Sequence, residues 1–596
     1  MQHYQPNTAD MAFIFTQVLQ APVQLQALSP YAELDADLTR QVLDESGNFV
    51  REVVAPLNRV GDEVGAQWAN GKVTMPPGFR DAYQAFWHGG WPALACATED
   101  GGQGLPVVLE ATLYEMLSAA NHGWTMAPGL LHGAYECIKH HASALLKARY
   151  LHKLATGEWL ATMCLTEPQA GSDLGMVRTK ATPQADGSYL LAGTKIFISG
   201  GEHDLTDNIV HLVLARLPQA MPGPKGLSLF LVPKVYDDGA RSAVHCERIE
   251  EKMGLHGSPT CVMRFDDATG WMVGEAGKGL AAMFVMMNAA RLHVALQGIG
   301  LLDAAWQKAD AYAQERRQMR APKAKAKATT AARDAVGGAT QTADLIAEHP
   351  AMRRILDTQR AWIDCGRVLA YTTAVELDML KHHTDPVRRE AAQRWCALVT
   401  PVMKAAFTQQ AFYGGSECLQ VFGGHGYVRE WGIEQHVRDA RVAMIYEGTN
   451  EIQAIDLLVR KVLADGGRSL CSLLDSLGAE LDHNGGRDGE GPSRTAVVER
   501  FARLRDLTTR LVGAAQRDPR LPYWVADDYL RAVAIALMGW AGARIAAALA
   551  PDTPELATRW RLPLRALTHW VLPEFDMRLA IVNAQVEEAS MLEDSV

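Results

Sequence analysis

The chain has 596 residues, of which 48% are hydrophobic and 21% are charged. This length exceeds what one hydrophobic core supports and suggests roughly three to four domains of an ordinary globular protein. The net charge of −10 and the lack of a long basic tract argue against nucleic acid as a partner.

The cysteines indicate a reducing compartment, and the most apolar stretch does not fit a transmembrane segment. The nine cysteines stand singly and form no CxxC pair, so we expect free thiols and no metal site. The N-terminus lacks the charged and apolar regions of a signal peptide. The most apolar stretch, residues 532–550, contains Arg544 and fits a buried helix better than a lipid span. We therefore expect a cytoplasmic protein without a transmembrane segment.

The hydrophobic pattern changes twice along the chain. Apolar residues recur three and four apart up to about residue 160 and again from about 276, which predicts helices. Between them, short β-rich runs such as IVHLVLAR and LSLFLVP are separated by turn residues, which predicts an antiparallel β domain. We expect a helical N-terminal extension (1–34), a helical domain (35–160), a β domain (161–275), a helical bundle (276–465), a linker (466–494) and a further helical domain (495–596).

Two segments of biased composition interrupt the helical regions. APKAKAKATTAARDAVGGATQ, at 321–341, is of low complexity and cationic at its start, which is typical of a solvated loop. DHNGGRDGEGPS, at 482–493, lies inside the expected linker.

The most informative motif is IYEGTNEIQ at 445–453. It places the carboxylate of Glu447 on a turn just before a predicted helix. Gly448 allows backbone N–H groups to approach a ligand closely. A Glu side chain among apolar neighbours has a raised pKa and can act as a base near neutral pH. The same residues also fit a simple helix cap, with Thr449 or Asn450 at the N-cap.

Two further motifs lie in the predicted β domain. MCLTEPQAGSDLG, at 163–175, runs from a strand into a polar turn, which offers N–H and hydroxyl donors to an anion or a heterocycle edge. FISGG, at 197–201, ends a strand with an aromatic residue that could cover a planar ring. Taken singly, the first motif fits a surface turn better than a ligand site, and a phenylalanine at a strand end is usually a core residue.

The last motif, LQVFGGHGYVREWGIEQHVRDAR at 419–441, contains a GGxG turn after a long predicted helix. It does not follow a strand and open a helix, so it does not fit a dinucleotide-binding fingerprint. His425 and His436 are better explained as structural residues than as metal ligands.

In this order, the motifs resemble the acyl-CoA dehydrogenase family. The chain matches its TEPxAGSD turn at 166–173, its KxxIS strand end at 195–200, its ER pair at 315–316, its QxxGGxG segment at 420–426 and its YEGT motif at 446–449. The resemblance covers about residues 35–465 and implies a helical N-terminal domain, a β-barrel-like middle domain and a helical bundle. The ends resemble larger bacterial members with an extra C-terminal helical domain, among them 3-methylmercaptopropionyl-CoA dehydrogenases.

The resemblance implies a role for each matching residue. It implies FAD as the cofactor and Glu447 as the catalytic base. The implied flavin contacts are Met163, Leu165, Thr166, Gly171, Ser172, Phe197, Ser199 and Thr449, joined from a neighbouring subunit by Arg316, Gln420 and Gly424. The implied acyl-CoA contacts are Ser172, Asn288, Arg291 and Gly448.

The resemblance also implies a reaction and its partners. Glu447 removes the α-proton of an acyl-CoA thioester while the β-hydrogen leaves as hydride to the flavin, which yields a trans-2-enoyl-CoA. The implied electron acceptor is an electron-transferring flavoprotein, and the implied assembly is a homodimer.

Two alternatives remain open from the residues, and two others are disfavoured. An acyl-CoA oxidase shares the fold and the glutamate, and a non-catalytic acyl-CoA-binding homologue shares the scaffold. Some branched-chain relatives carry the base on the long helix, but the matching stretch FVMMNAAR at 284–291 has no carboxylate. A nitroalkane oxidase would need an aspartate in place of Glu447.

Overall fold

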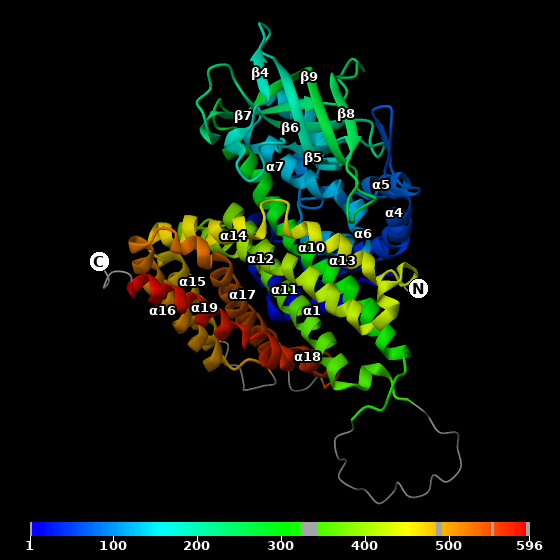
Figure 1. Ribbon diagram of the computed structural model, residues 1–596. Coiled ribbons are helices and arrows are strands. Elements are labelled where there is room, and N and C mark those ends of the chain that lie inside the picture. Colours follow the sequence, from blue (N-terminus) through cyan, green and yellow to red (C-terminus); the bar gives the residue numbers. More distant parts are fainter. Residues whose placement is uncertain (1–2, 323–342, 484–490, 550–553, 592–596) are drawn as a thin grey trace, which may run out of the picture.

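The structure is a computed structural model that describes residues 3–322, 343–483, 491–549 and 554–591. Figure 1 shows a β domain standing above one helical body, to which the segments before and after the β domain both contribute. The order of helices, β domain and helices is the one predicted from the hydrophobic pattern. Most of the cationic segment at 321–341 lies outside the described residues.

The N-terminal part is helical and is anchored in the helical body. Tyr4 is buried, and its hydroxyl donates to Asp303 Oδ2 at 3.1 Å. A small hairpin of β1 (Gln67–Ala69) and β2 (Lys72–Thr74) was not expected from the sequence. The α-helices of this part are α1 (Thr8–Phe13), α2 (Ala21–Gln26), α3 (Ala36–Phe49), α4 (Asn58–Val64), α5 (Phe79–His88), α6 (Val107–Thr125), α7 (Leu131–His141), α8 (Ala144–Leu146) and α9 (His152–Thr156).

The β domain closes on itself. Its strands are β3 (Leu160–Cys164), β4 (Lys180–Pro183), β5 (Tyr189–Ser199), β6 (Ile209–Arg216), β7 (Leu227–Pro233), β8 (Val244–Ile249) and β9 (Thr260–Val273). Successive pairings β6-β4-β5-β9-β7 return to β6, so five strands form a closed ring, with β3 added beside β6 and β8 beside β9. Closure removes exposed strand edges.

The β domain is mixed rather than purely antiparallel, which corrects the expectation from the sequence. Strand β6 runs parallel to β3 along its first half and meets β4 in parallel at Arg216. The remaining pairings are antiparallel. Apolar alternation predicts which side of a strand is buried, but strand direction depends on which distant segments pair.

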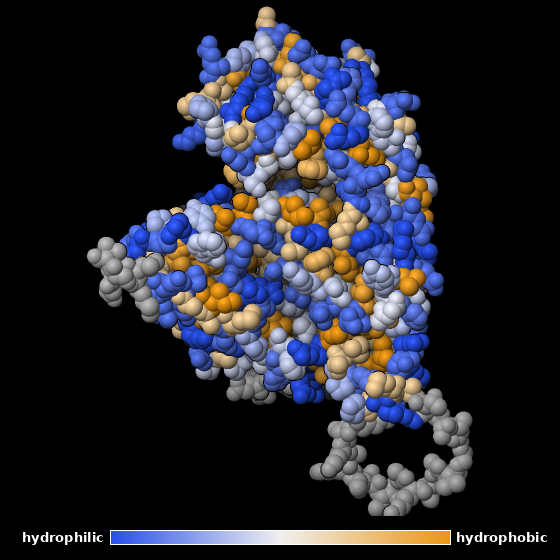
Figure 2. Space-filling view, in the orientation of Figure 1, coloured by the Kyte–Doolittle hydropathy of each residue, from blue (hydrophilic) through white to orange (hydrophobic). Residues whose placement is uncertain are grey.

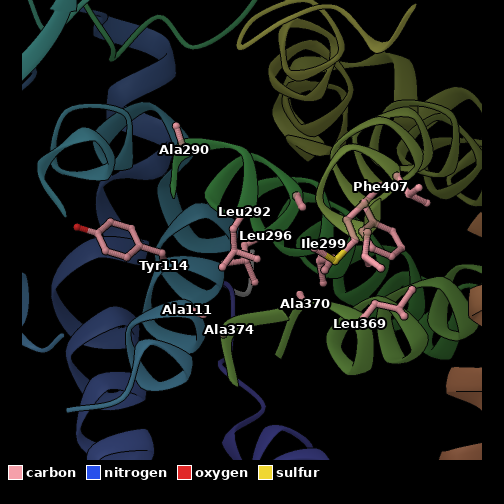
Figure 3. Packing of buried hydrophobic residues seen from close by; sticks show 14 of the residues in the cluster. Ala111, Tyr114, Ala290, Leu292, Leu296, Ile299, Leu369, Ala370, Ala374 and Phe407 are labelled. Carbon is pink, nitrogen blue, oxygen red and sulfur yellow. The ribbon is translucent and has the colours of Figure 1, made fainter. Parts of the chain in front are cut away.

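The helical bundle holds the centre of the core. Its α-helices are α10 (Gly279–Glu315), α11 (Pro350–His382), α12 (Pro386–Val421), α13 (Ile433–Arg441) and α14 (Asn450–Ile455). Helix α10 packs against α6, α11 and α12. Figure 3 shows Leu296 and Ile299 of α10 among Leu369 and Ala370 of α11 and Phe407 of α12, all buried.

The C-terminal region packs onto this bundle. Its helices are α15 (Arg468–His483), α16 (Arg494–Arg517), α17 (Leu521–Ala548), α18 (Pro554–Ala566) and α19 (Glu574–Met591). The expected linker at 466–494 is therefore largely helix, because α15 buries Leu470 and Leu474 against the neighbouring helices. Helix α17 packs directly on α14 and on the π-helix η15 (Asp456–Val462) that follows it.

Helices α10 and α17 are long and apolar enough to cross a membrane by length and composition. However, 71% of the apolar window in α10 and 78% of that in α17 are buried inside the protein. Both act as core helices here, which agrees with the expectation that the stretch at 532–550 is a buried helix.

Candidate active site

Glu447 lies on a strained turn between the short 3-10 helix η14 (Val442–Met444) and α14. Its φ is +55°, and that of Gly448 is +83°. A left-handed backbone is common for glycine but rare for glutamate, and such residues cluster at functional sites. Thr449 caps α14 by accepting the N–H of Ile452 at 3.3 Å. The turn thus joins a helix cap to a carboxylate held in an unusual conformation.

The Glu447 carboxyl group combines burial with an unpaired oxygen. Its Oε2 atom is buried and has no hydrogen-bond partner in the part of the chain that the structure describes. Burial raises the pKa of Glu447 to about 7, although the positive charges of Arg291 and Lys404 oppose this rise. A carboxyl group with this pKa can both accept and release a proton near neutral pH.

Side chains from four elements hold the turn. Gln453 of α14 donates from Nε2 to the carbonyl of Glu447 at 3.0 Å. Lys404 of α12 donates from Nζ to the carbonyl of Gly448 at 2.7 Å. The hydroxyl of Tyr446 donates to Gln297 Oε1 of α10 at 2.5 Å and lies 3.3 Å from His122 Nε2 of α6. The backbone around the carboxyl group is therefore fixed from several sides.

Sequence reasoning did not find Lys404, Gln453, Gln297 or His122. Each is a polar residue of a helix with no motif of its own, and such residues are usually satisfied structural groups. The one hint in the sequence was Lys404, a charged residue within the run TPVMKAAF.

The two β-domain motifs meet in space. The carbonyl of Thr166, after β3, accepts the N–H of Ile196 in β5 at 2.9 Å. The pairing of β5 with β9 is irregular between Lys195 and Ile198, and this irregularity gives Phe197 a φ of +58° and turns its ring outward, 60% exposed. Met163 is buried, Leu165, Thr166 and Ser199 are half-buried, and Gly171 and Ser172 are exposed.

This surface fits a planar ring. An exposed phenylalanine on a strand bulge stands beside the partly open backbone at Leu165 and Thr166, and such a face can stack and hydrogen-bond with a heterocycle. Figure 1 places α14 at the end of the helical body nearest the β domain. Figure 2 shows the surface hollowed between the two, with hydrophobic side chains gathered along the hollow.

A buried ion pair supports the turn at Glu167. Lys195 Nζ lies 2.8 Å from Glu167 Oε1 and donates to the carbonyl of Leu165 at 3.0 Å. Glu167 also accepts from the backbone of Arg178 and Thr179. Burial alone would raise the pKa of Glu167, but Lys195 and these donors outweigh it and lower the pKa to about 2. The pair keeps the Leu165–Thr166 backbone in place.

Three predicted flavin contacts lie elsewhere in the chain. Arg316 caps the end of α10, Gln420 lies in the last turn of α12, and Gly424 follows that helix; all three are exposed. Arg316 is separated from Arg291, which is near Glu447, by roughly 37 Å along α10 at 1.5 Å per residue. Within one chain these residues therefore do not join the Glu447 site.

The predicted substrate contacts also lie in separate places: some lie near Glu447, and one lies on the β domain. Arg291 is buried, its Nη1 lies 3.4 Å from Asp456 Oδ2, and its Nε has no partner among the residues described. Gly448 lies in the Glu447 turn, and Ser172 lies on the exposed turn of the β domain. The side chain of Asn288 lies outside the described part of the structure.

A large cavity lies away from Glu447. It has a volume of about 710 Å³ and lies between α4, the second half of α10 and the segment 429–436. Its walls include Trp306, Tyr312, Phe422 and Trp431. Cavity size therefore does not point to Glu447; its unpaired carboxyl oxygen and its strained turn make it a candidate.

Comparison with known proteins agrees with the class that this geometry defines. Models of the acyl-CoA dehydrogenase N-terminal, middle and C-terminal domains match residues 37–158, 162–268 and 324–462. The chain is 40% identical to 3-methylmercaptopropionyl-CoA dehydrogenase of Ruegeria pomeroyi over 90% of each protein. It is 33% identical to the broad-specificity linear acyl-CoA dehydrogenase of Mycobacterium tuberculosis, over 91% of this chain and 89% of the relative.

The fold is also shared with solved structures. An acyl-CoA dehydrogenase complexed with FAD from Bacillus anthracis aligns with a TM-score of 0.72 at 22% identity, over 96% of this chain and 92% of that one. Caenorhabditis elegans ACDH-11 in complex with C11-CoA aligns with a TM-score of 0.71 at 21% identity, over 93% and 90%. The chain belongs to the acyl-CoA dehydrogenase family, whose members are FAD-dependent oxidoreductases that dehydrogenate acyl-CoA.

Proposed function

We propose that this enzyme removes the α-proton and the β-hydride of an acyl-CoA thioester, with Glu447 as the base, and releases a trans-2-enoyl-CoA. The observation that carries the proposal is the Glu447 carboxyl group itself. It is held on a left-handed turn, its Oε2 is buried and unpaired among the described atoms, and its pKa is raised to about 7.

The same turn offers a donor to the thioester oxygen. The backbone N–H of Glu447 has no acceptor among the residues that the structure describes. A backbone N–H that is fixed beforehand and aimed at a developing oxyanion stabilises the enolate-like charge formed when the α-proton leaves. Gln453 and Lys404 hold the neighbouring carbonyls, so this N–H does not have to reorganise during the reaction.

The proposed ligand contacts come from the β domain and from the helical body. Met163, Leu165, Thr166, Gly171, Ser172, Phe197, Ser199 and Thr449 would hold FAD, which supplies the hydride acceptor when bound. Ser172, Asn288, Arg291 and Gly448 would contact acyl-CoA. The exposed ring of Phe197 and the partly open backbone of Thr166 support the flavin side.

We also propose a homodimer, in which Arg316, Gln420 and Gly424 reach the flavin of the partner subunit. Their exposure and their distance from Glu447 of the same chain support this arrangement. Light scattering of the purified protein should give twice the mass of one chain. A monomer that holds FAD stoichiometrically would contradict the proposal.

The reaction is tested by anaerobic mixing of the purified, FAD-loaded protein with acyl-CoAs of differing chain length. At least one acyl-CoA should bleach the flavin absorbance with formation of the 2-enoyl product. We propose an electron-transferring flavoprotein as the acceptor, and it should reoxidise the bleached enzyme faster than oxygen does. Rapid reoxidation by oxygen with release of peroxide would assign an acyl-CoA oxidase instead. Binding of acyl-CoA without any bleaching would overturn the enzymatic proposal.

A further inference from the structure

One lysine connects the core of the bundle to the turn that carries Glu447. Lys404 lies on α12, and its side chain is completely buried. Its ammonium group donates to the carbonyl of Gly448 at 2.7 Å and to Asn450 Oδ1 at 3.0 Å. Both acceptors follow Glu447 by no more than three positions, so one side chain spans the turn from its strained residue to the start of α14.

The second acceptor is itself held by α12. Asn450 donates from Nδ2 to the carbonyl of Ala405 at 3.1 Å, and Thr408 Oγ1 donates to Asn450 Oδ1 at 3.2 Å. The turn and the helix are thus joined by several hydrogen bonds within one small region. Among the described residues, a neutral, apolar side chain at 404 would leave the Gly448 carbonyl with only the longer contact from Gln453 Nε2 at 3.5 Å, and a poorly satisfied acceptor destabilises the conformation that buries it.

We propose that Lys404 is a positioning residue for Glu447: its ammonium group clamps the turn through Gly448 and Asn450 and also places a positive charge beside the catalytic carboxylate. The proposal rests on the function assigned above to Glu447, because a clamp has a catalytic consequence only if the clamped residue is the base. It adds a buried residue of α12 to the proposed reaction.

The charge has a direction of effect that can be measured. A nearby positive charge favours the ionised form of a carboxyl group and lowers its pKa. Arg291 and Lys404 are the two cations that act on Glu447 in this way. Removing either one should raise the pKa of Glu447 and leave less of the active carboxylate at a given pH.

Other charged groups surround this pair, and each belongs to a neighbouring element. Burial lowers the pKa of Lys404 to about 7, while Glu447 and Glu451 raise it and Arg291 lowers it further. Burial lowers the pKa of His122 to about 3, so the histidine facing the turn from α6 is neutral. The charged neighbours are Arg291 from α10, Glu451 from α14, and Asp456 and Lys461 from η15.

The test compares Lys404→Met with Lys404→Arg, Asn450→Ala and Lys308→Met, all as FAD-loaded full-length protein. Lys308 is a half-buried lysine in the second half of α10, far from the turn, and it serves as a matched control. Two measurements are made across pH: the anaerobic rate of flavin bleaching, and the infrared carboxylic-acid band of Glu447. Glu447→Gln assigns that band.

Lys404→Met should move both titrations to higher pH by about one unit, which lowers the bleaching rate about tenfold at pH 6 and much less at pH 9. Lys404→Arg keeps a positive charge across the whole pH range and should not move the titration to higher pH. Asn450→Ala removes only one acceptor of the clamp and should slow bleaching at every pH without moving the titration. Lys308→Met should match the wild type in both measurements. If Lys404→Met cannot be purified, Lys404→Gln replaces it with the same expectation.

Unchanged titrations in Lys404→Met would overturn the proposal, and so would an equal shift in Asn450→Ala, because the charge would then not be the cause. The infrared measurement needs no catalysis. If none of the acyl-CoAs bleaches the wild-type flavin, the proposed function fails. The infrared titration of Glu447 would still decide whether Lys404 sets the ionisation of that group.

Discussion

Two groups of buried charges lie in the same helical body, and they differ in how completely they are paired. The first, here called the interdomain ion network, consists of Asp10, Glu115, Asp303, Arg360, Asp364, Arg367 and Arg559. Arg367 lies 2.7 Å from Glu115 and 2.9 Å from Asp303, and Arg559 lies 2.7 Å from Asp10 and 2.8 Å from Asp364. These contacts tie α1, α6, α10 and α11 to α18 of the C-terminal region.

The Glu447 site is paired less completely, although Arg367 Nη1 of the network is also without a partner among the described residues. Glu447 Oε2, Arg291 Nε and Gln453 Oε1 are buried without hydrogen-bond partners in the described chain. A buried polar group without a partner is destabilising unless a ligand or water completes it. Each carboxylate of the network has an arginine partner and stabilises the fold. Glu447 keeps one carboxyl oxygen unpaired, which leaves it available for chemistry.

Glu447→Gln should have the largest effect on activity. The amide is nearly isosteric but cannot accept the α-proton, and loss of a general base typically slows a reaction by about 10² to 10⁴-fold. The loss could be larger here, because the stretch of α10 at 284–291 has no carboxylate. Anaerobic flavin bleaching measures the rate, and FAD content and acyl-CoA binding should be retained. Glu451→Gln, an exposed residue of α14, is the control and should bleach normally. Near wild-type bleaching by Glu447→Gln would show that Glu447 is not the base.

Arg367→Met should have the largest effect on stability. It leaves the buried carboxylates of Glu115 and Asp303 without their shared partner, and breaking a buried ion pair from one side costs about 3–5 kcal/mol. Chemical denaturation followed by fluorescence measures the loss. Arg40→Met breaks an exposed pair with Asp44 and should cost less than about 1 kcal/mol. Equal stability of the two variants would mean that the buried network stabilises the fold no more than an exposed ion pair does.

The pH dependence of the reaction follows from the raised pKa of Glu447. The carboxylate is the reactive form, so the bleaching rate should fall about tenfold for each pH unit below about 7. Glu447 affects the stability of the fold in the opposite direction. Its pKa is raised from 4.5 in the folded protein, so its ionisation there is unfavourable, and it destabilises the fold as pH rises from 4.5 through 7. Glu447→Gln should therefore be at least as stable as the wild type at pH 8. An acid limb near pH 4.5 would contradict the burial of this group.

Arg559→Met should have the smallest effect of the four. The Arg559 side chain is 26% exposed, and Arg360 still pairs with Asp10 and Asp364 after the change. A hydrogen bond to a charged group stabilises a fold by about 1.5–3 kcal/mol. Because Arg559 is partly exposed, its loss should cost an amount near the lower end of this range. Thermal unfolding measures the loss, and bleaching by the folded fraction should be unchanged. A loss as large as that of Arg367→Met would mean that the C-terminal region supports the core more strongly than these contacts indicate.

Local patterns in the sequence were enough to predict several features. The apolar spacing predicted the long helices that became α10, α11 and α12, because a period near 3.6 residues is a property of the segment itself. The YEGT motif predicted a turn before a helix, and Thr449 is the N-cap of α14. Glu447 was chosen from the type and order of its neighbours, and its role remains a prediction until the variant is measured.

Only the tertiary structure decided which distant segments meet. The parallel pairing of β3 with β6, the closed strand ring and the helix α15 inside the expected linker depend on partners far away in the chain. The contact of Lys404 with Gly448 joins residues 44 positions apart, and that of Arg559 with Asp10 joins residues 549 apart. A lone lysine or arginine in a helix looks the same whether it faces water or a buried acceptor. Burial and pairing arise from packing, and packing determines which charges stabilise the fold and which carboxyl group remains free to take a proton.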